Sequence, residues 1–505
     1  MSRDHNSADI WSESAARTGF DSVSELLVDG GDARISLTNG VNQYGRSAFP
    51  RAEVAEFGSA TASTISEGAY AACQALYGRL KDDLANRPDE TVYRDELERI
   101  RSRLRAYFHI EAMDAGIVIG ASGTDIHLVA AVVLRTICAR PLTVLGVARQ
   151  ETGSGIPDAL AARRFALAQA VDRNRATVAF DDVLYEAFSA RAPDGAPIGE
   201  DIIERGLEAA IVQARSQGRA ILLVVTDVSK TGLIAPSLET VWRLRRRWGS
   251  WLHILVDACQ ARISAKTLQA YIRNGCWVAV TGSKFLTGPA FCGALFLPSS
   301  VAGAAASIRL PRPLGLHVSR AEWPQTWRNG SQLPLRANLG LLMRWEAALY
   351  EADAFSPLDL AGDDSSIRRF ATAILQRLQA DPLLEPVPVT PLARPGLSHQ
   401  NSWDTVQTIF PFWMRRKGGD QLLSFPEVER IYRQITAIRG SLPSIEIGQP
   451  VACGVARGAP LGALRLCFSA RLAARAAGSG RRDENTARGL AVLDRVGQIV
   501  EAGTV

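Results

Sequence analysis

The sequence predicts an α/β protein with a large domain built on a mainly parallel sheet and a smaller α+β domain. From about residue 116, short β-branched runs alternate with stretches of helical periodicity, which is typical of a parallel sheet with crossover helices. The chain has 505 residues and 47% hydrophobic content, and single cores stop growing at about 250–300 residues. After Pro298 the alternation weakens and prolines become frequent. Together these observations predict two lobes.

The large domain is expected to contain a seven-stranded sheet, and six of its strands stand out in the sequence. They lie at residues 116–119, 142–146, 220–226, 252–256, 277–280 and 293–297, with helices at 65–80, 93–107, 125–138, 238–247 and 265–273. A long helix at 338–352 and one clear strand at 464–468 are expected in the smaller domain. We therefore divide the chain into an N-terminal arm with helices (1–90), a large domain (91–335) and a small C-terminal domain (336–505).

Composition argues against several classes of protein. The net charge is only +5, and the basic cluster at 245–247 lies on a helical stretch, so a nucleic-acid groove is not expected. Seven cysteines without a CxxC pair indicate reduced thiols in a cytoplasmic protein and no metal site. The longest apolar run, 128–139, falls short of the roughly 20 residues of a membrane span. The polar N-terminus does not resemble a signal peptide.

One lysine stands out from its surroundings. Lysines are only five of the 57 basic residues, so arginine serves as the generic surface cation. Lys284 follows an apolar strand and precedes a glycine turn. A partly buried amine has a lowered pKa and becomes nucleophilic toward an aldehyde, as a Schiff-base lysine must be. A lysine whose stem lies along apolar surface at a strand end is the alternative.

A carboxylate ends the preceding strand. Asp257 closes the apolar run 252–256, and strand carboxyl ends form the ligand crevice of a parallel sheet, so Asp257 and Lys284 are expected to open into one site. A carboxylate facing the pyridine nitrogen of pyridoxal 5′-phosphate (PLP) keeps it protonated, which makes the ring an electron sink. Taken alone, Asp257 could equally be a helix cap.

A small-residue turn precedes these two strands. In G-A-S-G-T-D, at 120–125, Ser122, Gly123 and Thr124 follow a strand and open a helix. Backbone N–H groups at a helix N-terminus, with hydroxyls beside them, form a phosphate cradle. Ser122 or Thr124 could simply cap the helix, and it is the order of the three elements that gives this turn its weight.

These elements together resemble the fold-type I PLP-dependent enzymes, and within them the class V aminotransferase group, which also contains cysteine desulfurases. The stretch V-D-A-C-Q at 256–260 is similar to that group's V-D-A-x-Q, which implies that Asp257 meets the pyridine nitrogen and Gln260 the ring O3′. T-G-S-K at 281–284, with G-P at 288–289 and G-A-L at 293–295, resembles the pattern around the Schiff-base lysine. The resemblance implies that Thr281 and Ser283 help to hold the phosphate.

Further matches extend outward over about residues 110 to 475. Ser229 lies where the family's N-x-x-G turn has Asn, so its contact near O3′ is a departure. N-G-S at 329–331 resembles the segment that reaches the phosphate of the neighbouring subunit, which implies a homodimer in which Ser331 serves the partner's site. Arg465 resembles the late arginine that grips the substrate α-carboxylate, a match for its planar fork. The ring that usually stacks on the cofactor is not visible at 149–154.

The motifs predict the cofactor before the reaction. Transamination of an amino acid, with Lys284 moving the α-proton, is the leading hypothesis. A carbon–sulfur lyase or desulfurase is the alternative, for which Cys453 is the candidate nucleophile, although the surrounding residues do not match a desulfurase motif and free cysteines are most often core filler. A catalytically silent regulatory protein of this fold is the third hypothesis, and the intact Lys284 and Asp257 count against it. Another lyase reaction, such as decarboxylation or β-elimination, and racemisation stay open within the enzyme hypothesis.

Overall fold

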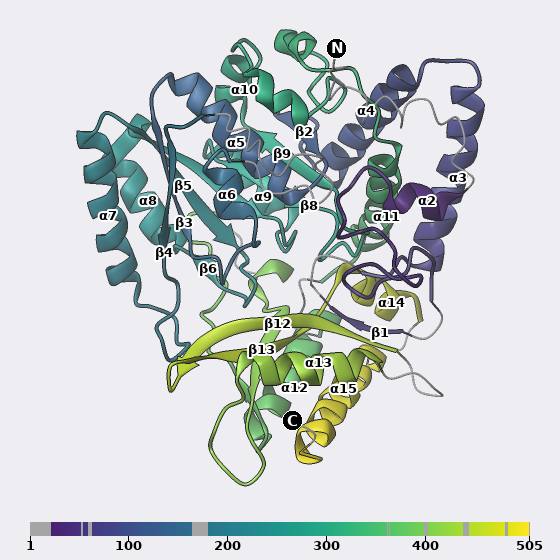
Figure 1. Cartoon of the computed structure of the whole chain (residues 1–505), viewed down its shortest axis with the longest axis vertical. Coiled ribbons are helices and arrows are strands. Elements are labelled where there is room, and N and C mark those ends of the chain that lie inside the picture. The colour runs from purple at the N-terminus through teal and green to yellow at the C-terminus, as the bar shows by residue number, and fades with distance from the viewer. Residues whose placement is uncertain are drawn as a thin grey trace, which may run out of the picture.

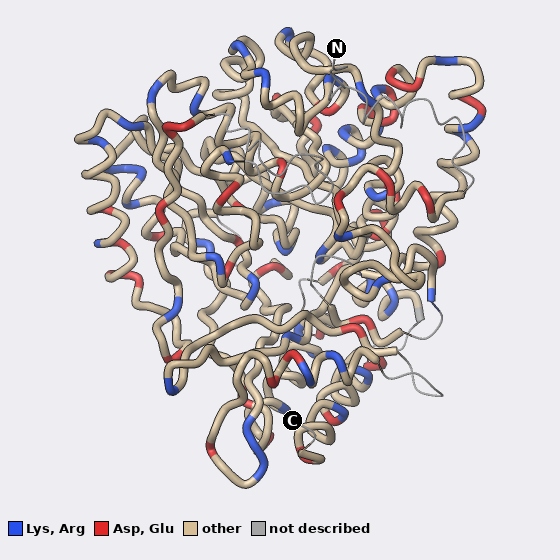
Figure 2. Tube along the Cα trace, in the orientation of Figure 1, with Lys and Arg blue, Asp and Glu red and all other residues tan. Residues whose placement is uncertain are grey.

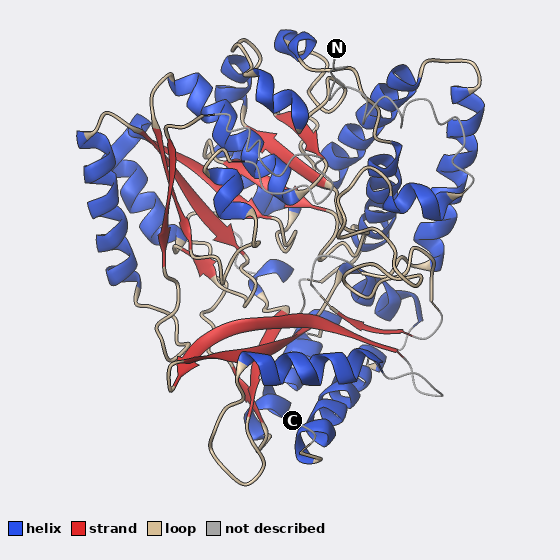
Figure 3. Ribbon diagram, viewed as in Figure 1, coloured by secondary structure: helices blue, strands red, loops and turns tan. Residues whose placement is uncertain are grey.

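The protein is described by a computed structural model. It covers residues 22–503 except 52–53, 59–62, 164–179, 361, 363, 398–401, 438–443 and 480–482. The first 21 residues of the predicted N-terminal arm therefore lie outside the described residues. Two sheets organise the rest of the chain, and helices flank both of them (Figure 3).

The larger sheet has the order β2-β9-β8-β7-β5-β3-β4, with β6 paired to the side of β5. Neighbours β4, β3, β5, β7 and β8 run parallel, whereas β9 is antiparallel to both β8 and β2. The mainly parallel sheet is thus confirmed. Seven strands lie side by side in it, and β6 is an eighth strand that pairs only with β5. The strands are β2 (Gly116–Gly120), β3 (Leu142–Val147), β4 (Val183–Phe188), β5 (Ala220–Asp227), β6 (Ile234–Ala235), β7 (Leu252–Ala258), β8 (Trp277–Thr281) and β9 (Gly293–Leu297).

Strand β4 is the one that the apolar pattern did not reveal. It lies at the edge of the sheet and most of its side chains are partly exposed, so it carries Glu186 and lacks the continuous apolar run of a central strand. The central strand β5 shows the contrast, because all of its residues are buried.

Helices cover both faces of the larger sheet (Figure 1). Along β5, Ile221, Leu223 and Val225 face one core and Leu222 and Val224 the other, as the two-residue period of a strand requires. The first core includes residues of α2 (Val23–Val28), α3 (Glu67–Leu84), α4 (Asp89–Tyr107), α7 (Glu200–Ser216), α8 (Leu238–Trp248), α9 (Ala265–Arg273) and α11 (Leu339–Phe355). The second includes residues of α5 (Gly123–Cys138), α6 (Ile156–Leu160) and α10 (Ser299–Ala305).

The smaller sheet has the order β1-β12-β13-β11-β10 and packs against helices that follow residue 365. Its strands are β1 (Val54–Phe57), β10 (Leu384–Pro386), β11 (Ile409–Met414), β12 (Ser444–Ala456) and β13 (Ala459–Cys467), and the helices are α12 (Ser366–Ala380), α13 (Phe425–Ala437), α14 (Ala470–Ser479) and α15 (Glu484–Glu501). In Figure 1, β12 and β13 lie across the molecule with α12, α13 and α15 beneath them.

The sequence analysis expected one clear strand here, and this expectation was too low. Strand β13 contains most of the predicted run, but Pro411 interrupts the pattern of β11, and Gly448 and Gly454 that of β12, whose register shifts relative to β13. Strand β1, from the region assigned to the arm, pairs in parallel with β12. The domain boundaries at 90 and 335 stay a prediction.

Charged residues are distributed over all parts of the fold. Figure 2 shows Lys and Arg interspersed with Asp and Glu along the trace. Among the residues that the structure describes, no helix combines the length and the apolar character needed to cross a bilayer.

Candidate active site

The loops that follow β2, β3, β5, β7 and β8 meet at one edge of the larger sheet. The last four of these strands are parallel neighbours, and β2 points the same way because both it and β8 are antiparallel to β9. In an open α/β sheet this edge is where ligands bind. It carries Asp257 and Lys284 together, as the sequence predicted.

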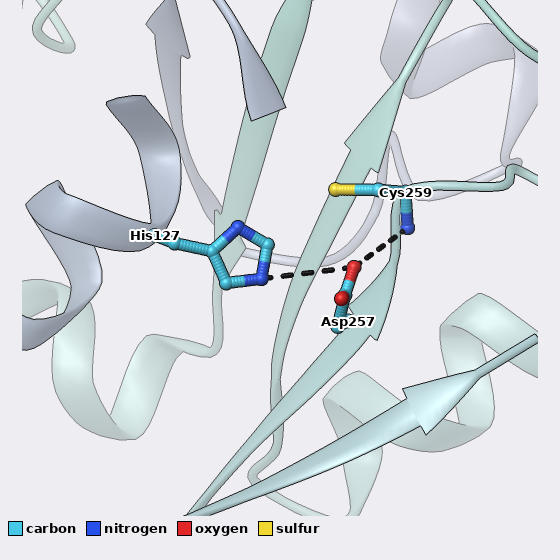
Figure 4. Close-up of side chains that lie close together, drawn as sticks. All are labelled: His127, Asp257 and Cys259. Atoms are coloured by element: carbon cyan, nitrogen blue, oxygen red, sulfur yellow. Dashed lines mark hydrogen bonds and ion pairs between the residues drawn. The ribbon is translucent and has the colours of Figure 1, made fainter. Parts of the chain in front are cut away.

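Asp257 is buried and held from three sides, and Figure 4 shows two of these contacts, with His127 and Cys259. Its Oδ1 accepts from the backbone N–H of Cys259 at 3.2 Å and lies 3.6 Å from His127 Nε2, while Oδ2 accepts from the Thr152 hydroxyl at 3.2 Å. Burial by itself would raise the pKa of Asp257, but His127, Lys284 and the Cys259 N–H more than offset it, and the pKa lies below the ordinary 3.8. The carboxyl is therefore an anion, as a partner for a pyridinium must be.

His127 was missed by the sequence analysis. It lies on α5, one turn after Gly123, and its Nδ1 is 2.6 Å from the Gly123 carbonyl, which turns Nε2 toward Asp257. The signal was available, because a residue four positions into a helix lies over the first turn and hence on the same side as the predicted phosphate cradle. His127 positions Asp257 and favours its charged form.

The variant His127→Asn tests this pairing. The amide can keep the bond to Gly123 but removes the nitrogen that faces Asp257, so less of the effect of burial is offset and the Asp257 pKa rises. In the wild type the stabilisation from ionised Asp257 is complete above the unfolded-state value near 3.8 and is lost as the pH falls through the lower folded-state pKa. In the variant the folded-state pKa lies closer to the unfolded-state value, so ionised Asp257 contributes less stability above pH 3.8 and the protein unfolds at a higher pH.

We expect the acid-unfolding midpoint of His127→Asn, followed by tryptophan fluorescence, to rise by about half to one pH unit. The matched control is His109→Asn, since His109 is exposed and its positive φ of 51° suits asparagine. Superimposable acid curves for the wild type and His127→Asn would contradict the pairing.

The cluster of His127, Asp257 and Cys259 is also the one group in the described residues with the spacing of metal ligands, its donor atoms lying within 4.8 Å of one another. Burial, followed by the charge of Asp257, raises the pKa of the Cys259 thiol well above its usual range. The Cys259 thiol is therefore neutral in this structure, and Asp257 is the anion of the cluster.

Lys284 lies just beyond β8, in a turn that is tied to the loop after β7. The N–H of Phe285 donates to the Gln260 carbonyl at 3.2 Å, and the turn closes through Thr287 N–H on the Lys284 carbonyl at 2.9 Å. The half-buried ammonium is close enough to Asp257 and Cys259 to affect the pKa of both.

The predicted phosphate cradle begins α5. The Ser122 hydroxyl caps the helix, accepting from Asp125 N–H at 3.2 Å and donating to Asp125 Oδ2 at 2.6 Å. The capping alternative is thus realised for Ser122, while the N–H groups of Gly123 and Thr124 stand at the free end of the helix. A Cβ on Gly123 would approach Thr281 Cγ2 to 2.9 Å, so only glycine allows this close packing.

Three further predicted residues border this cradle. The Thr281 hydroxyl donates to the Cys259 carbonyl at 2.7 Å, so its proton is already committed, whereas Ser283 Oγ makes only a 3.5 Å contact with Thr281 Oγ1. Gln260 is buried and its Oε1 has no hydrogen-bond partner among the described residues. A buried amide end without a partner marks a place for a polar ligand atom, and amide oxygen and nitrogen are interchangeable by a flip.

Ser229 lies at this edge, but its hydroxyl forms hydrogen bonds within the protein. Its hydroxyl donates to Glu151 Oε2 at 2.7 Å and accepts from the N–H groups of Thr231 and Leu233. Its predicted contact with the cofactor is not part of this structure and stays a prediction. Glu151 and Thr152, in the loop after β3, also belong to the candidate site. The sequence analysis considered this segment only for an aromatic ring and did not predict them.

Arg465 reaches the same edge from the smaller sheet. It lies on β13, donates to the Gln449 carbonyl from Nε at 3.2 Å and Nη2 at 2.9 Å, and donates from Nη1 to the Lys230 carbonyl at 3.2 Å. Burial lowers the pKa of its guanidinium. Among the described residues this buried cation bonds only to carbonyls, and an anionic group would complete such an arrangement.

Two predicted residues lie apart from this cluster. Ser331 is exposed on a 3-10 turn (Arg328–Gln332), where its hydroxyl donates to the Arg328 carbonyl. Its role in a partner's site stays a prediction. Cys453 is buried in a small apolar cluster with Val387, Trp413, Val451, Leu461 and Ala463, and burial raises the pKa of its thiol to about 11.

Comparisons with known proteins agree on the fold. No protein-family model and no curated protein sequence matches the chain. A structure described as a NifS-like protein superposes with a TM-score of 0.53 at 12% identity, covering 89% of this chain and 99% of that one. Catharanthus roseus tryptophan decarboxylase in complex with L-tryptophan superposes with a TM-score of 0.50 at 13% identity, covering 89% and 83%. The chain therefore has the fold of the fold-type I PLP-dependent enzymes, as its motifs predicted.

Proposed function

We propose that the protein is a PLP-dependent enzyme that acts on an amino acid. The observation that carries the proposal is the meeting of Lys284 with the ionised, buried Asp257 at the carboxyl edge of the sheet, next to the unpartnered Gln260 amide. The residues present fit this cofactor, since they include an amine for its aldehyde, an anion for its pyridinium and a helix end for its phosphate.

Each group has a role in this proposal. Lys284 would hold the cofactor through its amine and would move the substrate α-proton. Asp257, positioned by His127 and Thr152, would keep the ring nitrogen protonated, while Gly123, Thr124 and Ser283 would donate to the phosphate. When bound, PLP supplies an electron sink for charge that develops at the substrate α-carbon.

We propose transamination as the reaction, because Arg465 would orient an α-carboxylate and no second nucleophile stands ready. Cys453 is the candidate for carbon–sulfur chemistry, but its thiol is buried in an apolar cluster with its pKa raised to about 11, and the thiolate is the nucleophile. A desulfurase that uses this thiolate therefore requires a rearrangement around Cys453.

The variant Cys453→Ala tests this choice. Because the thiol fills apolar space, we expect kcat/KM to change by less than about 3-fold, with any loss appearing in stability instead. Loss of turnover at full folding, together with sulfide release from cysteine by the wild type, would support the lyase.

The proposal is tested on the purified chain incubated with PLP. We expect an absorbance band above about 400 nm, as a conjugated imine shows. We also expect borohydride to fix an adduct that maps to Lys284. The holoenzyme should then transfer an amino group to 2-oxo acids. A protein that stays colourless and unlabelled overturns it. The homodimer and the cytoplasmic location belong to the same proposal, and the exposure of Ser331 leaves it accessible to a partner subunit.

A further inference from the structure

Lys230 is the second lysine of the candidate active site, and the proposed mechanism gives it no role. It lies in the turn after β5, where its N–H donates to the Glu151 carbonyl at 2.9 Å. Its neighbours on both sides, Ser229 and Thr231, donate their hydroxyls to the Glu151 carboxylate. The backbone of Lys230 is thus fixed, and only its side chain is left without a defined task.

Glu151 is not the counter-ion of Lys230. Its carboxylate, which is nearly inaccessible to solvent, already accepts from Ser229 Oγ at 2.7 Å, Thr231 Oγ1 at 2.7 Å and Arg191 Nε at 2.8 Å. Lys230 Nζ instead donates to the backbone carbonyl of Arg149 at 3.2 Å. Within the part of the chain that the structure describes, the Lys230 ammonium forms no ion pair.

Most of the charged groups near Lys230 are cations, and Glu151 is the anion among them. Burial, then Arg465 and then Lys284 lower the pKa of Lys230 to about 8. Arg465 Nη1 is bonded to the Lys230 carbonyl itself, and Arg465 bonds only to carbonyls among its described partners. Lys230, Arg465 and Lys284 thus gather at one edge, where the Glu151 carboxylate is already paired with Arg191 and the Asp257 carboxylate lies near Lys284. Such a cluster is complete only when anions bind.

We propose that Lys230 binds a second anionic group, on the side chain of the substrate, so that the enzyme acts on acidic amino acids or their 2-oxo acids. The inference rests on the proposed function: Lys284 serves the cofactor and Arg465 the α-carboxylate, which leaves Lys230 for the distal anion. An ammonium suits this position because a point charge accepts a carboxylate or a phosphate without requiring a planar match. The class of substrate is therefore set by charge, with aspartate, glutamate and phosphoserine as its members.

The test is the variant Lys230→Met in the holoenzyme, assayed on matched pairs that differ only in side-chain charge: aspartate against asparagine and glutamate against glutamine. Loss of one charge-assisted contact is expected to lower kcat/KM for the acidic member by about 30- to 100-fold, mainly through KM. The neutral member should change by less than about 3-fold, and Lys230→Arg should restore part of the preference. Phosphoserine distinguishes a phosphate from a carboxylate as the preferred distal group.

A control and a second readout make the outcome decisive. Lys266→Met removes an exposed lysine of α9 and should leave every ratio unchanged. Binding of the unreactive pair succinate and propionate, measured by calorimetry on wild type and Lys230→Met, needs no turnover. Equal losses for acidic and neutral substrates, or equal affinity of both proteins for succinate, would overturn the inference.

Failure of the inference differs from failure of the proposed function. A borohydride-fixed adduct on Lys284 in both proteins, combined with unchanged charge preference in Lys230→Met, removes the role of Lys230 and leaves the PLP enzyme standing. The absence of the adduct in the wild type removes the proposed function, and succinate binding then decides whether Lys230 belongs to an anion site.

Discussion

Replacing Lys284 with alanine is expected to abolish the reducible cofactor adduct and to lower kcat by about 10³- to 10⁵-fold. The large effect has two sources, since the variant loses both the covalent anchor of the cofactor and the base that moves the α-proton. The phosphate cradle and Asp257 remain, so PLP should still bind without a covalent bond. Borohydride labelling, mass spectrometry and single-turnover assays with an acidic amino acid measure the three consequences separately.

The matched control is Lys266→Ala, because Lys266 is exposed on α9 and does not contact the cluster at the strand ends. Both variants should show wild-type circular dichroism. Added methylamine should return part of the activity of Lys284→Ala, as a free base replaces a missing one, and should do nothing for the control. A fully active Lys284→Ala would rule out the proposed chemistry.

The large sheet could be predicted because its central strands are buried on both faces. Residues 220–225 and 254–256 form continuous apolar runs within strands whose residues are almost all buried, and such strands can be recognised from a single sequence. The edge strand β4 and the bulged β12 could not be recognised in this way, since solvent and register shifts relax the demand for apolar residues. The smaller sheet was therefore underestimated.

The candidate site shows a similar division. Asp257 and Lys284 were predictable because each stands directly at the end of an apolar strand, and parallel strand ends meet at one edge. His127 was overlooked although its spacing from Gly123 places it on the cradle side of the helix, and Lys230 could not be predicted because hydrogen bonds around Glu151 place it. The sequence shows which residues end apolar strands. It does not show which side chains form hydrogen bonds to one carboxylate in the folded protein.

The turn that carries Lys230 is itself anchored by a buried ion pair at the end of β5. Asp227 is fully buried and accepts from Arg394 Nε at 2.8 Å and Nη2 at 2.6 Å, as well as from the Tyr271 hydroxyl at 2.6 Å. Arg394 follows β10 in the chain and also donates to the Asp404 carbonyl at 2.6 Å. The pair thus ties the segment after β10 to the edge of the larger sheet.

Arg394→Met is expected to destabilise the protein by about 3–5 kcal/mol, because it leaves a buried carboxylate without its cation. Arg135 and Asp182 provide the matched control, since they form the same two-bond geometry at 2.9 and 2.7 Å but remain partly exposed. Arg135→Met should therefore cost less than about 1 kcal/mol. Urea unfolding with equal m-values measures both changes.

The double variant Asp227→Asn/Arg394→Met separates loss of attraction from the cost of a stranded charge. If the stranded carboxylate accounts for most of the damage, the double variant should be more stable than Arg394→Met alone, because the remaining amide carries no charge and can still accept from Tyr271. Since Asp227 directly precedes the turn at 228–232, the surviving fraction of Arg394→Met should also show a raised KM for acidic substrates. If Arg394→Met lost no more stability than Arg135→Met, burial would add nothing to the Asp227–Arg394 pair.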